Sequence, residues 1–199
     1  MATAFSEHEK VMIRKALKAC ALECMSKYGI KKTTVEQLAL GANISKGAFY
    51  KFYNTKEELF FEVLEDFHEV IYAEALHILQ TRTDLPDAAR LEEAFFQACK
   101  LVKSYAIMEV VEREMDYLFR KLPPSLIASH MASDAENIYA LLQKGNINLS
   151  IDPDFITAVM HAVICIVLNP KMVGEKYYDD ALRLVIRGAC KELFSDTTH

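Results

Sequence analysis

Hydrogen-bond donors are concentrated in one short stretch of the chain, residues 45–56, which read SKGAFYKFYNTK. Lys46, Tyr50 and Lys51 can each donate a hydrogen bond to a phosphate oxygen, and Gly47 adds little bulk beside them. A segment that combines small, basic and aromatic residues in this way is suited to contact with a polyanion.

The distribution of charge agrees with this reading. The 199 residues carry a formal net charge of −5, yet residues 1–60 hold ten Lys/Arg and six Asp/Glu, a net +4. The remaining residues therefore carry −9. A basic end on an acidic body indicates that the first sixty residues meet the polyanion.

The elements that must position these residues are helices. Gly and Pro are scarce, with six and five copies, and alternating strand patterns are absent, so we expect an all-α fold. Ser6 begins a first helix that Gly29 ends. The capping residues Thr34, Ser45 and Thr55 then predict helices over 34–43, 46–53 and 55–80.

A helix, a tight turn and a second short helix within residues 34–55 are the sequence pattern of a helix-turn-helix. The second helix is short enough to enter a DNA major groove, and its small and basic residues could reach phosphates and base edges. The alternative is a solvated helix with capping residues and core aromatics. Phe49 is expected in the core under both readings.

The stretch TTVEQLALGANISKGAFYKFYNTKEELF, residues 33–60, resembles the DNA-binding signature of TetR-type transcriptional regulators. Residue type and spacing agree at many positions, and the resemblance covers about residues 10–65. It implies a domain order of helix-turn-helix (1–54), connecting helix (55–80), and ligand-binding and dimerisation domain (81–199).

The resemblance also implies which residues contact DNA: Thr34, Ser45, Lys46, Gly47, Tyr50, Lys51 and Lys56. Thr34 and Lys56 would grip phosphates, and Lys46 and Gly47 would face base edges. The chain departs from the family pattern at the turn, where Asn43 replaces glycine, although Asn also tolerates a left-handed backbone. At Tyr53 we expect the hydroxyl to reach the edge of the domain.

The rest of the chain predicts five more helices, over 87–105, 107–121, 124–145, 153–169 and 175–194, which makes about nine in all. The last two carry more apolar surface than one small core requires. Small residues there favour close packing of a dimer, in which two recognition helices would lie about 34 Å apart on DNA. The dimer candidates are Ala158, Ala162, Cys165, Leu184 and Gly188, and a monomer core is the alternative.

Large and soft side chains in the middle helices could line a pocket for an apolar or aromatic small molecule. The candidates are Phe95, Phe96, Tyr105, Met108, Met115, Tyr117, Phe119, His130, Tyr139, Met160 and His161. Plain core is the alternative for the apolar residues, and a hydrogen-bonded core position for each histidine. A solvated helix face with internal ion pairs is expected for the charged residues Glu109, Glu112, Arg113, Glu114 and Asp116. The alternative is that Glu109 and Glu112 meet a cationic ligand.

The sequence does not support an enzyme, a secreted protein or a membrane protein. The sequence has no phosphate-binding glycine loop, nucleophile elbow or H-E-x-x-H motif, so we expect neither an enzyme nor a cofactor or metal site. No signal peptide or membrane span is expected, and five scattered cysteines are typical of a reducing cytoplasm.

We therefore expect a dimeric transcriptional regulator, a repressor, that binds a palindromic operator and is released by a small effector. The alternative is a DNA-binding regulator controlled by a protein partner or by oxidation of its cysteines.

Overall fold

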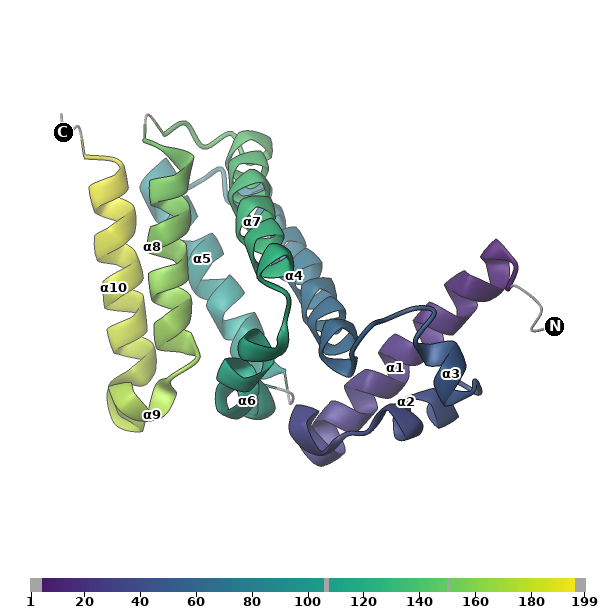
Figure 1. The fold of residues 1–199 in the computed structure, drawn as a ribbon. Helices are drawn as coiled ribbons and strands as arrows, with labels where there is room; N and C mark the ends of the chain where they lie inside the picture. The colour runs from purple at the N-terminus through teal and green to yellow at the C-terminus, as the bar shows by residue number, and fades with distance from the viewer. Residues whose placement is uncertain (1–4, 106–107, 150, 196–199) are drawn as a thin grey trace. The chain divides into compact units, whose positions relative to one another are not determined.

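The computed structural model describes residues 5–105, 108–149 and 151–195. Within them the chain forms ten α-helices, one 3₁₀ turn and no strand, as predicted for an all-α fold (Figure 1). The helix that the sequence did not predict is α9, which has four residues. The bounds are α1 Glu7–Lys32, α2 Val35–Gly41, α3 Lys46–Phe49, α4 Lys56–Thr81, α5 Asp87–Ser104, α6 Met108–Lys121, α7 Pro124–Lys144, α8 Pro153–Val167, α9 Pro170–Val173, η1 Glu175–Tyr177 and α10 Tyr178–Leu193.

The chain divides into two compact units. Unit 1 comprises residues 1–67 and 109–123, and so holds α1–α3, the first part of α4 and nearly all of α6. Unit 2 comprises residues 68–108 and 124–199, with the rest of α4 and the helices α5 and α7–α10.

Unit 1 is built around a small apolar core. Helix α1 packs on α2, and α2 on α3. Leu17, Met25, Leu38, Phe49 and Phe60 are fully buried. Helix α1 is kinked at Gly29, whose φ of 79° is left-handed, and continues to Lys32. The predicted stop at Gly29 is therefore a kink, with one further turn of chain beyond it.

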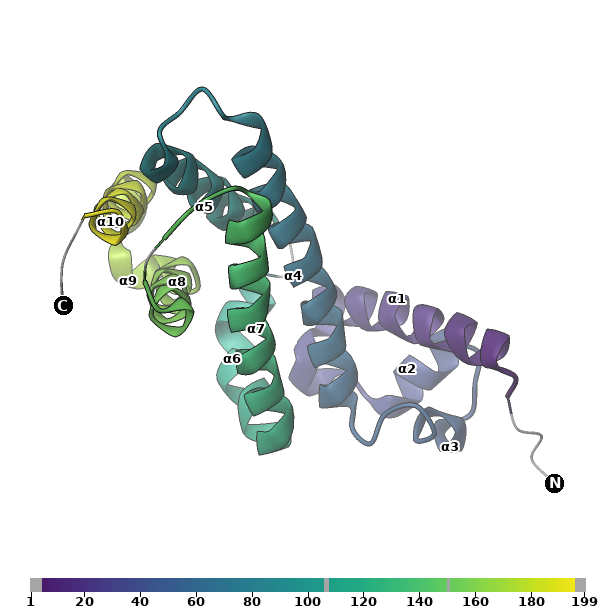
Figure 2. The ribbon, with the colours of Figure 1, turned by 90° about the horizontal axis from the view of Figure 1, so that it is seen from above.

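Unit 2 is a helical bundle. Helix α10 packs on α5 and α8, and α8 also packs on α7 (Figures 1 and 2). Short helix α9 lies between the ends of α8 and α10 (Figure 1). Residues from all the long helices of the unit form one buried cluster, including Leu79, Phe95, Leu142, Val163 and Ile186. Among the described residues, none of the helices has the length and apolar character of a transmembrane segment.

Candidate functional site

The helix-turn-helix begins with a complete capping box. The Gln37 N–H donates to Thr34 Oγ1 at 3.2 Å, and the Thr34 N–H donates to Gln37 Oε1 at 2.8 Å. Helix α2 ends in a Schellman motif, in which the Ile44 N–H donates to the Ala39 carbonyl and Asn43 has a φ of 56°. The left-handed turn predicted at Asn43 is therefore present.

Helix α3 is anchored by one side and exposes the other. Ser45 Oγ accepts a hydrogen bond from the Ala48 N–H at 3.1 Å, and Phe49 is fully buried. Lys46, Gly47 and Lys51 are exposed, and 49% of Tyr50 is exposed. The helix ends at Phe49 and not at Tyr53 as predicted, because residues 51 and 52 bond back three positions and tighten the chain into turns.

Lys46 pairs with an acidic neighbour on α2. Its Nζ lies 2.6 Å from Glu36 Oε1, and this contact raises the pKa of Lys46 and lowers that of Glu36. Both side chains are exposed, so the pair can open when a phosphate or a base competes for the ammonium.

Lys56 lies in a different environment from the other predicted DNA contacts. Its Nζ donates to the carbonyls of Ile30, Lys31 and Thr33 at 2.6–2.9 Å, just after the kink in α1. Burial lowers its pKa, an effect that Glu57 and Glu114 oppose. A phosphate contact by Lys56 stays a prediction, and it would require the ammonium to leave these carbonyls.

The prediction for the Tyr53 hydroxyl is wrong. The residue is 5% exposed and its hydroxyl is buried, because the ring packs against Phe49 with centroids 5.9 Å apart. The guanidinium of Arg14 lies 5.2 Å from the ring centroid. Burial raises the pKa of the phenol above its usual range.

The pocket candidates divide between the two units. Met115, Tyr117 and Phe119 lie on α6 in unit 1, where the Tyr117 hydroxyl donates to Glu57 Oε1 at 2.7 Å. The candidates in unit 2 are not equivalent: Phe95 and Phe96 are buried in the core, Met108 and Met160 pack against it, Tyr105 ends α5, and Tyr139 is exposed.

His130 and His161 come together at one carboxylate, that of Asp134, which is 6% exposed. His68 and Tyr72 of α4 contact the same group. Burial raises the pKa of Asp134, but hydrogen bonds from His68 and His161 and the nearby His130 outweigh it and lower the value to about 2. Sequence reasoning missed Asp134, His68 and Tyr72, since only the packing of α4, α7 and α8 unites them.

The dimer candidates all lie on the surface of unit 2. Ala158, Ala162 and Cys165 of α8 and Leu184 and Gly188 of α10 are exposed, and these two helices are neighbours (Figure 1). Phe155, Met172 and Val185 add further exposed apolar area to these helices and to α9.

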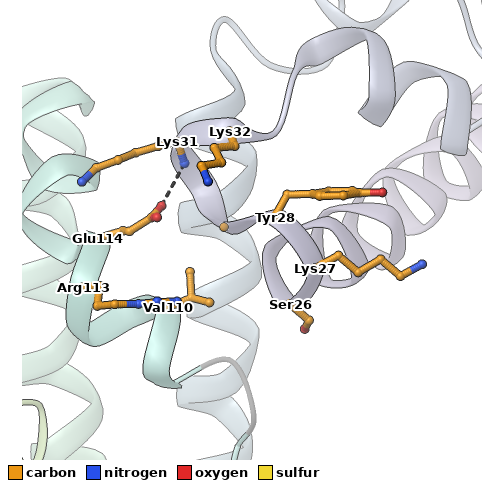
Figure 3. Close-up of a pocket in the computed structure, with 9 residues that line it drawn as sticks. Ser26, Lys27, Tyr28, Lys31, Lys32, Val110, Arg113 and Glu114 are labelled. Atoms are coloured by element: carbon orange, nitrogen blue, oxygen red, sulfur yellow. Dashed lines mark hydrogen bonds between the residues drawn. The ribbon is translucent and has the colours of Figure 1, made fainter.

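A cavity of about 440 Å³ lies within unit 1, between the end of α1 and α6 (Figure 3). Its wall includes Lys27, Lys31, Lys32, Arg113 and Glu114. The Glu114 carboxylate accepts a hydrogen bond from the Lys31 backbone N–H at 2.9 Å, which corrects the expectation that the whole run at 109–116 is a solvated face (Figure 3).

Comparison with known proteins agrees with these elements. Residues 18–63 match the family of bacterial regulatory proteins, tetR family. The uncharacterized HTH-type transcriptional regulator YuxN of Bacillus subtilis (strain 168) is 29% identical over 113 residues, which are 56% of this chain and 37% of YuxN. The chain thus matches well under half the length of that relative.

Two solved structures have a similar fold over nearly the whole chain. RolR in complex with resorcinol has a TM-score of 0.62 at 17% identity, covering 96% of this chain and 97% of RolR. NalD of Pseudomonas aeruginosa, described as the secondary repressor of the MexAB-OprM multidrug efflux pump, has a TM-score of 0.54 at 17% identity, covering 94% of this chain and 100% of NalD.

TetR-family regulators are DNA-binding transcription factors and not enzymes. Residues 18–63 therefore carry the DNA-binding signature of the tetR family, and the fold of the whole chain is similar to those of RolR and NalD.

Proposed function

We propose that the chain is a repressor that binds a palindromic DNA operator as a dimer and leaves it when a small effector binds. The observation that carries the DNA-binding part is the exposed side of α3. Lys46, Gly47, Tyr50 and Lys51 face solvent there, while Phe49 anchors the opposite side in the core. This is what a helix must offer to a major groove.

The free N–H groups at helix starts strengthen the same surface. Thr34 and Ser45 cap α2 and α3, so each helix directs the positive end of its dipole to the region that a DNA backbone would approach. We propose that Thr34 and Ser45 position phosphates, and that Lys46 and Gly47 read base edges.

Dimerisation would cover apolar surface that is otherwise open to water. Leu184 is 68% exposed and Phe155 57% exposed, on helices that also expose Ala158, Ala162 and Gly188. Exposed apolar side chains on two neighbouring helices are typical of a subunit interface. A two-fold axis through α8 and α10 would pair this surface with itself.

The effector would bind in unit 2. RolR, which has a similar fold, is described in complex with resorcinol, a small aromatic molecule with two hydroxyl groups. The aromatic core of α5 and the polar cluster around Asp134 would suit a ligand that is mainly apolar or aromatic with few polar anchors. The contacts between the effector and the predicted pocket residues stay a prediction.

The coupling between effector and DNA would run along α4. This helix is continuous from Lys56 to Thr81 and belongs to unit 1 at its start and to unit 2 at its end. An effector that favours one position of α4 would change the spacing of the two recognition helices.

Control by oxidation of cysteine receives less support. Burial raises the pKa of Cys20 to about 11, an effect to which Cys24 adds, and burial also raises the pKa of Cys99 and Cys190 to about 12. These thiols are protonated at neutral pH and react slowly with oxidants.

Selection from a pool of duplex DNA with a random central segment tests DNA binding and identifies the operator sequence at the same time. The wild-type chain is expected to enrich an inverted repeat whose half-sites lie about one helical turn apart. Lys46→Ala and Tyr50→Ala should fail to enrich it, with circular dichroism and oligomeric state unchanged.

Lys27→Ala serves as the matched control, since Lys27 is an exposed lysine of unit 1 that pairs with Glu23 outside the helix-turn-helix. If the wild type enriches no sequence, or if Lys46→Ala and Tyr50→Ala enrich the same repeat as Lys27→Ala, the assignment of α3 is wrong. A repeat that is enriched but not released by any small molecule would contradict the effector part alone.

A further inference from the structure

Three helices of unit 2 each direct imidazole nitrogen toward one buried carboxylate. Asp134 Oδ2 lies 3.1 Å from His161 Nε2 and 3.5 Å from His130 Nε2. Asp134 Oδ1 lies 3.6 Å from His68 Nδ1. His68 comes from α4, His130 and Asp134 from α7, and His161 from α8.

Each of these three separations, taken singly, is one that two ligands of the same metal ion would show. Two donors that are each about 2.1 Å from a tetrahedral Zn²⁺ lie about 3.4 Å from each other. The three nitrogen-to-oxygen distances span 3.1–3.6 Å. A ring nitrogen of His68 and one of His130 also lie within 4.8 Å of each other, so binding of one ion by all four residues requires the imidazoles to move closer together.

We propose that unit 2 binds one divalent transition-metal ion, of the class of Zn²⁺, Co²⁺ and Ni²⁺, through His68, His130, Asp134 and His161. Imidazole donors favour these ions, whereas Mg²⁺ and Ca²⁺ require mostly oxygen ligands. The proposal does not depend on DNA binding, because all four ligands lie in unit 2.

The surroundings of the carboxylate also fit a metal ligand. The Tyr72 hydroxyl donates to Asp134 Oδ1 at 3.2 Å, which holds the carboxylate in a fixed orientation. His130 and Asp134 are four residues apart on α7, so the helix presents both on one face. An ion bound here would fasten α4, α7 and α8 together.

The burial of the ligands indicates how the ion would enter. The side chains of His130 and Asp134 are 9% and 8% exposed, whereas those of His68 and His161 are 39% and 36% exposed. The ion would therefore arrive from the side of His68 and His161 and exchange with solvent. Because metal competes with protons for imidazole nitrogen, the affinity should fall as the solution is made more acidic.

Titration of the tag-free full-length chain with CoCl₂ and with ZnCl₂ tests the site. We expect one equivalent of Co²⁺ with the intense visible absorption of tetrahedral cobalt, and displacement of that ion by Zn²⁺. His130→Ala and His161→Ala should lower the affinity at least about tenfold, and Tyr72→Phe, which removes the outer hydrogen bond, about tenfold.

His77→Ala is the matched control, because His77 is an exposed histidine on the same helix as His68. The titrations are repeated in a Cys20→Ser/Cys24→Ser background, since the two sulfur atoms lie 3.9 Å apart and could also hold Zn²⁺. In the wild type, Co²⁺ bound to Cys20 and Cys24 would show thiolate-to-cobalt charge-transfer absorption, which is absent from the Ser variant.

A wild-type chain that takes up no Co²⁺ or Zn²⁺ outside the cysteine pair would overturn the proposal. Binding that survives in His130→Ala, His161→Ala and Tyr72→Phe with the affinity of His77→Ala would overturn it as well. Tyr72→Phe keeps this test decisive if a histidine variant fails to fold, because it leaves the packing of the ring unchanged.

Discussion

Asn43 illustrates how one residue sets the geometry of the helix-turn-helix. It occupies the left-handed position that ends α2, with a φ of 56°, and the Ile44 N–H bonds back to Ala39 from there. A side chain that disfavours this backbone would disturb the angle between α2 and α3.

Asn43→Ala is expected to lower the free energy of unfolding by about 1 kcal/mol, since left-handed backbone costs an L-residue about that much. Asn43→Gly, the matched control, should be neutral or slightly stabilising. Urea unfolding followed by circular dichroism measures both. Equal stabilities of the Ala and Gly variants would contradict a left-handed Asn43.

Asp134 gives unit 2 a dependence on pH. Its pKa is lowered from 3.8 to about 2, so the folded state favours the charged form. This preference stabilises the folded state by about 2 kcal/mol at any pH above the pKa that Asp134 has in the unfolded chain. The stabilisation is lost as the pH falls through the folded-state pKa of about 2, because over that range the carboxyl binds a proton more readily in the unfolded chain.

Asp134→Asn is therefore expected to be less stable than the wild type near neutral pH, and the difference should shrink toward pH 2. Chemical unfolding in metal-free buffer across this pH range measures it, with the exposed Asp180→Asn as the control. If the difference in the free energy of unfolding between wild type and Asp134→Asn does not change with pH, the charge of the Asp134 carboxylate does not contribute to stability.

At the scale of elements, α6 belongs with the N-terminal helices. The Glu114 carboxylate accepts a hydrogen bond from the Lys31 N–H, and the Tyr117 hydroxyl donates one to Glu57. Two side chains of α6 thus contact the end of α1 and the start of α4. Lys56 adds three hydrogen bonds to the carbonyls beyond the kink in α1. The kinked end of α1 is thus held from both neighbouring helices.

Lys56→Met keeps most of the side-chain volume and removes these bonds. It is expected to destabilise unit 1 by about 2 kcal/mol, because three hydrogen bonds from a charged donor to backbone carbonyls are lost. Hydrogen exchange of residues 30–34 should rise in the same variant. Lys51→Met, at an exposed position in the turn after α3, should leave both quantities unchanged.

Most of the helices could be predicted from the sequence because their signals are local. Thr34, Ser45 and Thr55 each accept the backbone hydrogen bond expected of a capping residue. The place of α6 and the cluster around Asp134 could not be predicted, because they depend on contacts between residues more than 50 positions apart, such as Tyr117 with Glu57 and Tyr72 with Asp134. The helical pattern shows which face is apolar but not which partner it meets.

At the scale of the whole molecule, the proposed dimer accounts for the apolar surface of α8 and α10. Leu184 is 68% exposed, and a two-fold interface would bury it in both subunits, which would contribute about 2–4 kcal/mol. Leu184→Glu is expected to shift the chain from dimer to monomer at micromolar concentration.

Sedimentation velocity measures this shift, and Leu40→Glu is the matched control because Leu40 is an exposed leucine on α2, at 81% against 68% for Leu184. A Leu184→Glu chain that remains dimeric, or a wild type that is monomeric, would contradict an interface through α8 and α10.

The central claim, that the exposed side of α3 reads DNA, is tested most directly by fluorescence anisotropy with a selected duplex and a scrambled one over a range of salt concentrations. The wild type is expected to prefer the selected duplex and to weaken steeply with salt. Lys51→Ala should weaken both duplexes alike and reduce the salt slope by about one, whereas Lys46→Ala should reduce the preference itself. A wild type that binds both duplexes equally, or variants with the wild-type slope and preference, would contradict the claim.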